Sequence, residues 1–334
     1  MQKLTISDIA TLAGVSTATV SNYINGNYNK MSPKTREHLT RIINETNYHP
    51  NSVARNLAKN ENRTIGVSIA DITNPFTSAI LSGISEVCDQ YGYKVLFTNS
   101  DGSAKNEINN IIRLRSENVL GFIIDSVNPD SPIYKSFTNE CAVMVDRQAL
   151  HANLDTIVTD NTSAVEEMIQ KMLAKNYDEL YFVSWPIEKI STRLQRYQGF
   201  LNATKYLNDD HLIIVPHRGK TADYQAFNAT IKKIMLKKQN KKIGFFTMNA
   251  RVFLRLLKAM QEANFNYPTD YGVATYEEFD WMMTMRPEIS RIRQDSRAIG
   301  QAAAKLLHQK LEQAKPKDPE TIIVPTTLVV KDSF

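Results

Sequence analysis

Residues 5–26 read TISDIATLAGVSTATVSNYING, and this stretch decides how the N-terminal part of the chain folds. Thr5 is followed three residues later by an aspartate, the spacing of a capping box at a helix start. Gly14 stands where a helix ends most easily, because glycine adopts the left-handed conformation without steric cost. Ser16 is suited to cap a second, short helix over residues 17–24. The pattern predicts two short helices joined by a tight turn, a helix-turn-helix.

A third helix and a small core complete this predicted module. The pair Ser32-Pro33 is a favoured helix start, because serine caps the first turn and proline fits its first position. The core of the module is predicted to contain small and apolar side chains, with Ala10 at the helix crossing and Val15 in the turn. The apolar face of the third helix and its closing aromatic residue are Leu39, Ile42, Ile43 and Tyr48.

The charge of the chain is concentrated in this module. The formal net charge is +5, and residues 1–60 hold seven basic and three acidic side chains. A basic, folded segment favours a polyanionic partner. The second helix is uncharged and rich in hydroxyl groups, which suits insertion into the major groove with phosphate contacts at its start. The module therefore predicts sequence-specific binding of double-stranded DNA.

Composition places the rest of the chain among ordinary globular proteins. Its 334 residues are 42% hydrophobic and 22% charged, enough for two or three folded units. Cys88 and Cys141 have no metal-type spacing, so we expect reduced thiols in a cytoplasmic protein, with no metal or cofactor. Asp8 interrupts the apolar stretch that a signal peptide would need, and no apolar run approaches 18 residues. We expect a protein that is neither exported nor inserted in a membrane.

From residue 65 the pattern changes to strands that alternate with amphipathic segments of helical length. Two such series predict two doubly wound parallel sheets in a periplasmic-binding-protein-like body. The predicted strands are 65–70, 94–98, 121–125, 142–145, 180–184, 212–215, 242–247 and 272–276. The predicted domains are an all-α helix-turn-helix domain (1–49), a hinge helix and linker (50–62), and an effector-binding and dimerisation domain (63–334). Within it we expect one lobe over 63–160 and 291–320, and a second over 161–290 and 321–334.

Ligands of such α/β bodies bind at the carboxyl ends of the strands, so the residues there are candidates. After the first strand come Asp71, Asn74 and Phe76. Asn74 before a proline is also a plain helix start, whereas the Phe76 ring can stack on a sugar face. Arg147 lies at a crossing between the lobes, where it could reach the ligand or pin the hinge. These residues predict a cleft for a small polar molecule.

A pair of arginines marks the second half of the cleft. Residues 191–200 read STRLQRYQGF, which places Thr192, Arg193 and Arg196 at the start of a predicted helix. Arg193 and Arg196 are one turn apart on the same face, and paired arginines suit a carboxylate or a phosphate. Surface arginines without a ligand are the plainer alternative. The spacing favours an acidic ligand.

The N-terminal motif resembles that of the lactose-repressor (LacI) family. The shared residues are T-I-S-D-I-A-x-L-A-G-V-S-x-x-T-V-S-x-x-I-N-G, then S-P-K-T-R-E and N-Y-H-P-N-S-V-A-R-N-L, and the likeness continues through almost the whole chain. The resemblance implies that Thr17, Ala18 and Asn22 read bases, with Asn22 supplying the main hydrogen bonds. The further residues that we expect to face DNA are Thr5, Ser16, Thr19, Ser21, Asn25, Thr35, Asn51, Ala54, Arg55 and Leu57.

The segment 51–57 is too short to form a stable helix alone in water, and a plain linker is one interpretation. The family resemblance implies instead that two such segments pair in a homodimer and fold on DNA. Leu57 would then be the wedge in a minor-groove step, with Ala54 beside it and Arg55 at a phosphate. The two-fold dimer would read a pseudopalindromic operator.

The resemblance also assigns residues to the effector cleft. Arg196 occupies the position that binds the effector in relatives. Asn249 matches their strand-end asparagine, although Ala250 replaces the aspartate that usually follows it. Glu277 occupies a position at which the family usually has aspartate, a shorter acidic residue. The complete predicted effector set is Asp71, Asn74, Phe76, Arg147, Thr192, Arg193, Arg196, Asn249, Glu277 and Trp281. The combination resembles regulators of ketodeoxygluconate and related uronate catabolism.

Together these observations predict a transcriptional repressor of carbohydrate catabolism, switched by a small sugar or sugar acid such as 2-keto-3-deoxygluconate. A regulator that answers to a neutral sugar, a nucleobase corepressor or an adaptor protein is the alternative. A stand-alone sugar-binding protein is disfavoured by the DNA module. An enzyme is disfavoured because no nucleophile, phosphate-loop or paired-carboxylate motif is present.

Overall fold

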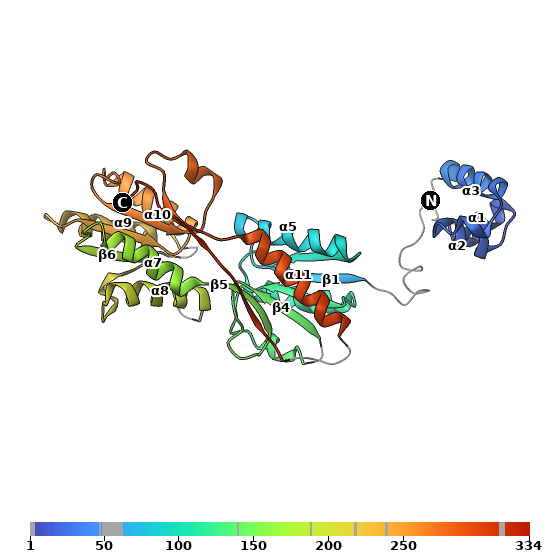
Figure 1. The fold of residues 1–334 in the computed structure, drawn as a ribbon, viewed down its shortest axis with the longest axis horizontal. Helices are drawn as coiled ribbons and strands as arrows, with labels where there is room; N and C mark the ends of the chain where they lie inside the picture. The colour runs from blue at the N-terminus through green and yellow to red at the C-terminus, as the bar shows by residue number, and fades with distance from the viewer. Residues whose placement is uncertain are drawn as a thin grey trace. The chain divides into compact units, whose positions relative to one another are not determined.

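The computed structural model describes residues 4–46, 48, 63–138, 140–187, 189–216, 219–237, 240–313 and 318–334. The chain separates into two compact units, 1–62 and 63–334, and each is described by itself (Figure 1). The hinge predicted over 50–62 lies outside the described residues.

The N-terminal unit contains the predicted helix-turn-helix. Its helices are α1 (Ile6–Ala13), α2 (Thr17–Ile24) and α3 (Pro33–Thr46), with a short 3₁₀ helix η1 (Tyr28–Lys30) before α3. Thr5 and Asp8 form the complete capping box, and Gly14 ends α1 with a φ of 62°. Ser16 caps α2 by accepting from the Thr19 amide. These local signals are confirmed.

The three helices enclose a small apolar core. Ile9, Val20 and Leu39, one from each helix, are completely buried, and Tyr48 closes the cluster. Ala10 is buried where α1 meets α2, as predicted for a close crossing. By contrast, the first residues of α2 point away from this core. The core therefore holds α2 while leaving its start open to solvent.

The second unit consists of two lobes, each built on one sheet. Among the described residues the first sheet has the strand order β11-β5-β4-β3-β1-β2, and the second has the order β12-β10-β9-β8-β6-β7. The strands of the first sheet are β1 (Thr64–Ile69), β2 (Lys94–Asn99), β3 (Gly121–Asp125), β4 (Cys141–Val145), β5 (Asp155–Thr159) and β11 (Thr321–Val324). Those of the second are β6 (Glu179–Ser184), β7 (Leu212–Ile214), β8 (Ile243–Thr247), β9 (Gly272–Tyr276), β10 (Ser290–Arg293) and β12 (Thr327–Val329).

Neighbouring strands are parallel except for the pair of β10 and β12. The α-helices of the first lobe are α5 (Pro75–Gln90), α6 (Ala104–Ser116) and α11 (Ser296–Glu312). Those of the second lobe are α7 (Asn161–Leu173), α8 (Ser191–Thr204), α9 (Thr221–Lys237) and α10 (Ala250–Glu262). Short 3₁₀ helices are η2 (Pro132–Ser136), η3 (Asp209–His211) and η4 (Asp280–Thr284). The predicted class, a helical module followed by an α/β body with two doubly wound sheets, is confirmed.

The boundary between the lobes differs from the prediction. We expected residues 291–320 in the first lobe and 321–334 in the second. However, β10 pairs with β9 in the second sheet, and β11 pairs with β5 in the first, with Thr321 opposite Thr156. The chain thus crosses after β10 and again between β11 and β12. Short strands such as these carry too little pattern to show which sheet edge they join.

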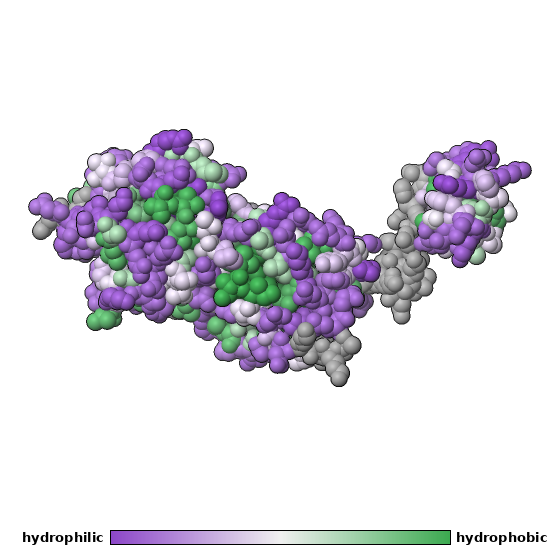
Figure 2. All heavy atoms as spheres, in the orientation of Figure 1, coloured by the Kyte–Doolittle hydropathy of each residue, from purple (hydrophilic) through white to green (hydrophobic). Residues whose placement is uncertain are grey.

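Each sheet has its own apolar core. Figure 2 shows a mostly hydrophilic face of the molecule, with hydrophobic side chains gathered in patches. Within the described residues, no helix is both long and apolar enough to cross a membrane.

Helices α5 and α11 lie side by side on the first sheet and touch through glycines (Figure 1). A Cβ added at Gly300 would lie 2.0 Å from the Ile80 carbonyl oxygen, and one at Gly83 would lie 2.1 Å from the Arg297 carbonyl oxygen. The backbones approach so closely that only glycine fits at either position.

We expect Gly300→Ala to destabilise the protein by about 2 kcal/mol and to lower Tm by roughly 5 °C. Alanine gains about 1 kcal/mol in helix propensity, but the backbone clash outweighs this gain. Thermal unfolding measures the change, and Gln309→Ala at an exposed site of the same helix is the control. A variant as stable as the wild type would contradict the close backbone contact between α5 and α11.

Candidate ligand cleft and DNA-facing helix

A cleft of about 870 Å³ lies between the two lobes at the carboxyl ends of the strands. Its lining includes most of the predicted effector set, namely Asp71, Asn74, Phe76, Arg147, Thr192, Arg193, Arg196, Asn249 and Glu277. Residues that the sequence did not single out, including Asp125, Trp185 and Arg251, also line it. The topology thus brings together side chains that are up to about 200 residues apart in the chain.

Trp281 is the predicted effector residue that does not line the cleft. Its ring stacks on Phe253 with centroids 6.0 Å apart, and it packs against the core of the second lobe. The 3₁₀ turn of η4 carries the indole to the core side of the strand end, so its assignment to the cleft was wrong. Trp185 lines the cleft instead. Its place directly after β6 was the signal that could have found it.

Arg196 is buried and its donors are used within the protein. Its Nε donates to Asn161 Oδ1 (2.8 Å) and its Nη1 to the Met248 carbonyl (2.9 Å). Its guanidinium lies over the Tyr276 ring, 3.6 Å from the centroid, and its Nη2 is 3.9 Å from Asp146. Arg196 therefore ties together strand ends at the base of the cleft.

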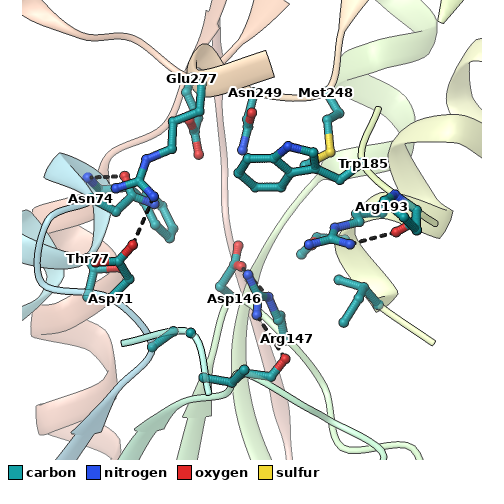
Figure 3. A pocket seen from close by; sticks show the side chains of 18 of the residues that line it. Asp71, Asn74, Thr77, Asp146, Arg147, Trp185, Arg193, Met248, Asn249 and Glu277 are labelled. Carbon is teal, nitrogen blue, oxygen red and sulfur yellow. Dashed lines mark hydrogen bonds and ion pairs between the residues drawn. The ribbon is translucent and has the colours of Figure 1, made fainter. Parts of the chain in front are cut away.

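Arg193 has few partners among the described residues. Its Nη1 donates to the Pro186 carbonyl (2.6 Å), while its buried Nε has no hydrogen-bond partner in the described part of the chain. Among the described residues, no carboxylate lies within ion-pairing distance of it. Desolvation, with the nearby charges of Arg147 and Arg196, lowers the pKa of Arg193 to about 9. Figure 3 shows its guanidinium directed into the space between the lobes, beside Trp185. Such a cation is suited to receive an anion.

Arg147 follows β4, and its side chain projects from the first lobe into the cleft (Figure 3). Its Nη1 donates to the Ser126 carbonyl (2.6 Å) and the Val127 carbonyl (3.3 Å). Its Nε is 3.6 Å from Asp146 and makes no hydrogen bond to any residue that the structure describes. Asp146 is thus the near carboxylate for Arg147 and Arg196, and the centre of the cleft has an excess of positive charge.

Two buried carboxyl groups line the same cleft. Burial raises the pKa of Glu277 to about 7, although the Arg196 charge and a bond from the Ala250 amide (3.1 Å) oppose this shift. Burial also raises the pKa of Asp125 to about 6, and its carboxylate accepts from the Thr77 hydroxyl (3.0 Å). Glu277 has a φ of 76°, a strained conformation of the kind found at functional sites. Near neutral pH, Glu277 changes between a neutral donor and an anion.

The titration of Glu277 gives the cleft an expected pH dependence. An ionised Glu277 repels an acidic ligand, so the Kd of the ligand should rise about tenfold per pH unit above pH 7. Calorimetric titration between pH 6 and 8.5 checks this. Glu277→Gln should remove most of the dependence above pH 7, where Asp125 is already ionised, and Glu167→Gln, exposed on α7, should keep it. An unchanged Kd over this range in the wild type would refute the assignment.

The lobes are connected across the cleft by ion pairs. Arg251 on α10 donates through Nη1 to Asp71 Oδ2 (2.8 Å) and through Nη2 to the Thr73 hydroxyl (2.9 Å). Lys189 pairs with Asp130 at 2.6 Å. Asp71, predicted to contact the effector, is therefore engaged by Arg251, which sequence reasoning missed.

The asparagines of the cleft have structural bonds. Asn74 caps α5 by accepting from the Phe76 amide, as its alternative interpretation predicts. Asn249 caps α10 by accepting from the Val252 amide (2.9 Å). The cap uses the Asn249 carbonyl, and Figure 3 shows this side chain at the cleft wall beside Met248.

Helix α2 presents the predicted base-reading residues. Thr17 and Ala18 are exposed, and Asn22 has no side-chain hydrogen-bond partner within the described part of the chain. The predicted phosphate-facing residues form local bonds, with the Ser16 and Thr19 hydroxyls 2.9 Å apart and Asn25 donating to the Ser21 carbonyl. The Thr35 hydroxyl is 2.8 Å from that of Ser32. The hinge residues Asn51, Ala54, Arg55 and Leu57 lie outside the described residues.

Comparisons with known proteins agree with this architecture. A family model described as "Bacterial regulatory proteins, lacI family" matches residues 5–51, and a "Periplasmic binding protein-like domain" matches residues 169–334. The chain is 30% identical to the HTH-type transcriptional regulator KdgR of Bacillus subtilis over 99% of its own length and 97% of that protein. It is also 30% identical to the regulator PtxS of Pseudomonas putida, over 93% and 90%. A solved lac repressor dimer bound to operator superposes with a TM-score of 0.82, at 21% identity and 99% coverage of both chains.

A helix-turn-helix module joined to a two-lobed body, together with these relatives, defines a DNA-binding transcriptional regulator. The chain belongs to the LacI family of bacterial regulatory proteins.

Proposed function

We propose that this protein represses genes of sugar-acid catabolism. A small acid of the 2-keto-3-deoxygluconate type, bound in the cleft, would change its affinity for operator DNA. The observation that carries this proposal is Arg193, a half-buried guanidinium that faces the cleft without a carboxylate partner among the described residues. A buried, uncompensated cation is costly, and a ligand carboxylate would relieve that cost through charge-assisted hydrogen bonds.

The rest of the lining supports a sugar-like ligand. Phe76 and Trp185 offer rings that can stack on a sugar face, and Thr192 and Asn249 offer polar groups for hydroxyls. The volume lies in the range of small-molecule pockets. The similarity to the regulator KdgR over nearly the whole chain is in keeping with the subgroup that the sequence resembles.

A homodimer is part of the proposal. The edge strand β2 leaves Leu96 and Phe97 exposed, at 37% and 50% of their surface. An edge strand with exposed apolar side chains favours association. A two-fold dimer pairs two helix-turn-helix modules and so requires a pseudopalindromic operator. Leu57 would act there as the minor-groove wedge.

The switch works through the two lobes. The cleft lies between them, and a ligand that prefers one lobe arrangement shifts the population toward it. The change in that arrangement would alter the spacing of the paired hinges in the dimer. Operator titration with and without the ligand will determine whether the ligand releases DNA or promotes DNA binding.

Thermal-shift measurement with 2-keto-3-deoxygluconate, 2-ketogluconate, gluconate and glucose tests the proposed class. We expect the keto acids to raise Tm in a concentration-dependent way, because a ligand that binds the folded state stabilises it. Glucose should leave Tm unchanged. Stabilisation by the neutral sugar and not by the acids would overturn the proposal.

A further inference from the structure

Glu107 is a completely buried carboxyl group outside the cleft, on helix α6 of the first lobe. Its Oε1 accepts from the Val127 amide (2.7 Å) and its Oε2 from the Asn128 amide (3.1 Å). The Tyr134 hydroxyl, itself buried, donates to Oε1 at 2.7 Å. A carboxylate in the interior is costly unless such donors surround it. Here two of the donors are consecutive backbone amides of one loop.

The same two peptide groups contact the cleft. In a trans peptide the N–H and C=O bonds point in opposite directions. The Val127 amide shares its peptide plane with the Ser126 carbonyl, and the Asn128 amide shares its plane with the Val127 carbonyl. Turning both amides toward Glu107 therefore turns both carbonyls away from it. Those carbonyls are the two acceptors of Arg147 Nη1, at 2.6 and 3.3 Å.

A second contact holds the loop in the same orientation. The Tyr134 hydroxyl lies 2.7 Å from Ser126 Oγ as well as from Glu107. Glu107 and Tyr134 together thus fix residues 126–128 from the side that faces away from the cleft. Arg147 depends on these carbonyls, since within the described ranges its Nε makes no hydrogen bond and its ion-pair partner, Asp146, is 3.6 Å away.

We propose that Glu107 is a positioning residue for the cleft: it orients the peptide planes of the 126–128 loop so that their carbonyls hold the Arg147 guanidinium against the ligand. The part of this inference that concerns the ligand rests on the proposed function. The part that concerns Arg147 does not.

The substitution Glu107→Gln tests the inference without a ligand. Glutamine has nearly the same shape, but its NH₂ group cannot accept from a backbone amide, so at least one peptide plane loses its anchor. The readout is the rate at which phenylglyoxal modifies individual arginines of the full-length protein, followed by peptide mass spectrometry. We expect the rate at Arg147 to rise about tenfold, the scale of one lost charge-assisted hydrogen bond.

Arg115 is the internal control, because it lies on the same helix as Glu107 and has its own partners. It pairs with Glu140 at 2.7 Å and donates to the Ser136 hydroxyl at 2.8 Å. Its rate should stay unchanged. Equal increases at both arginines would show that helix α6 has merely loosened, and no increase at Arg147 would equally overturn the proposal. Tyr134→Phe, which leaves both backbone amides bonded to Glu107, should give a smaller increase at Arg147 and provides a second variant if Glu107→Gln does not fold.

A ligand arm then uses 2-keto-3-deoxygluconate in a double-mutant cycle. Glu107→Gln should weaken its binding in the wild type but not in an Arg147→Gln background, because the effect passes through Arg147. Additive losses would contradict the positioning role. If the acid does not bind the wild type, the proposed function fails, while the arginine modification still decides the inference.

Discussion

Replacing Arg193 with alanine is expected to weaken binding of the sugar acid about 100-fold, a loss of about 3 kcal/mol. The guanidinium is half-buried and has no carboxylate partner among the described residues, so the ligand carboxylate would supply its compensation. Removal leaves that desolvated carboxylate with one cation fewer beside it. Arg196 is a poorer test, because its loss also leaves Asn161 and the Met248 carbonyl without their donor.

Isothermal titration with 2-keto-3-deoxygluconate measures the effect. Arg286→Ala is the matched control, since Arg286 is an exposed arginine of the same lobe that bonds only to nearby carbonyls in the described structure. The control should bind the acid as the wild type does. An Arg193→Ala protein that retains wild-type affinity would remove the central support for an acidic ligand.

The second large effect is expected at the DNA-facing helix, where Asn22→Ala should weaken operator binding by about 10- to 100-fold. Thr17 and Ala18 can offer only a hydroxyl and methyl groups, so the free amide of Asn22 is the richest hydrogen-bonding group on this face. Val20 and the capping residue Ser16 are untouched by the substitution, so the helix should remain folded.

The measurement is a gel shift at fixed salt, with an operator selected from random DNA by the wild-type protein. Asn44→Ala, exposed on α3, is the control and should retain affinity. Because Asn22 is expected to read a base and not a phosphate, the dependence of affinity on salt should keep its slope. A loss that appears equally with unrelated DNA would show that Asn22 has no role in sequence readout.

The helix-turn-helix could be predicted closely because its signals are local. The capping box at Thr5, the left-handed turn at Gly14 and the cap at Ser16 act within three or four residues of themselves. The alternating pattern of the body was equally readable, since strands such as β3, β5, β8 and β9 are buried along their whole length. The short strands β10 and β11 were placed in the wrong lobes, because two sheet edges compete for them and only packing decides.

The cleft was predicted in outline because the carboxyl ends of parallel strands converge in this topology. Its detail was not. Trp281 and Trp185 both follow strand ends, and only the direction of the next turn sends one to the core and the other to the cleft. The Asp71–Arg251 pair joins residues 180 positions apart, which no local spacing reveals.

By itself, the sequence determined the class of this protein: a capped helix-turn-helix, a two-sheet body and a cleft rich in arginine. These follow from periodicity, caps and strand ends, which are properties of neighbouring residues. Only the tertiary structure decided how the arginines differ, with Arg196 bound into the base of the cleft, Arg193 left facing it, and Arg147 held by a loop that Glu107 orients. The physical reason is that the environment of a charge depends on burial and on partners brought together from distant segments.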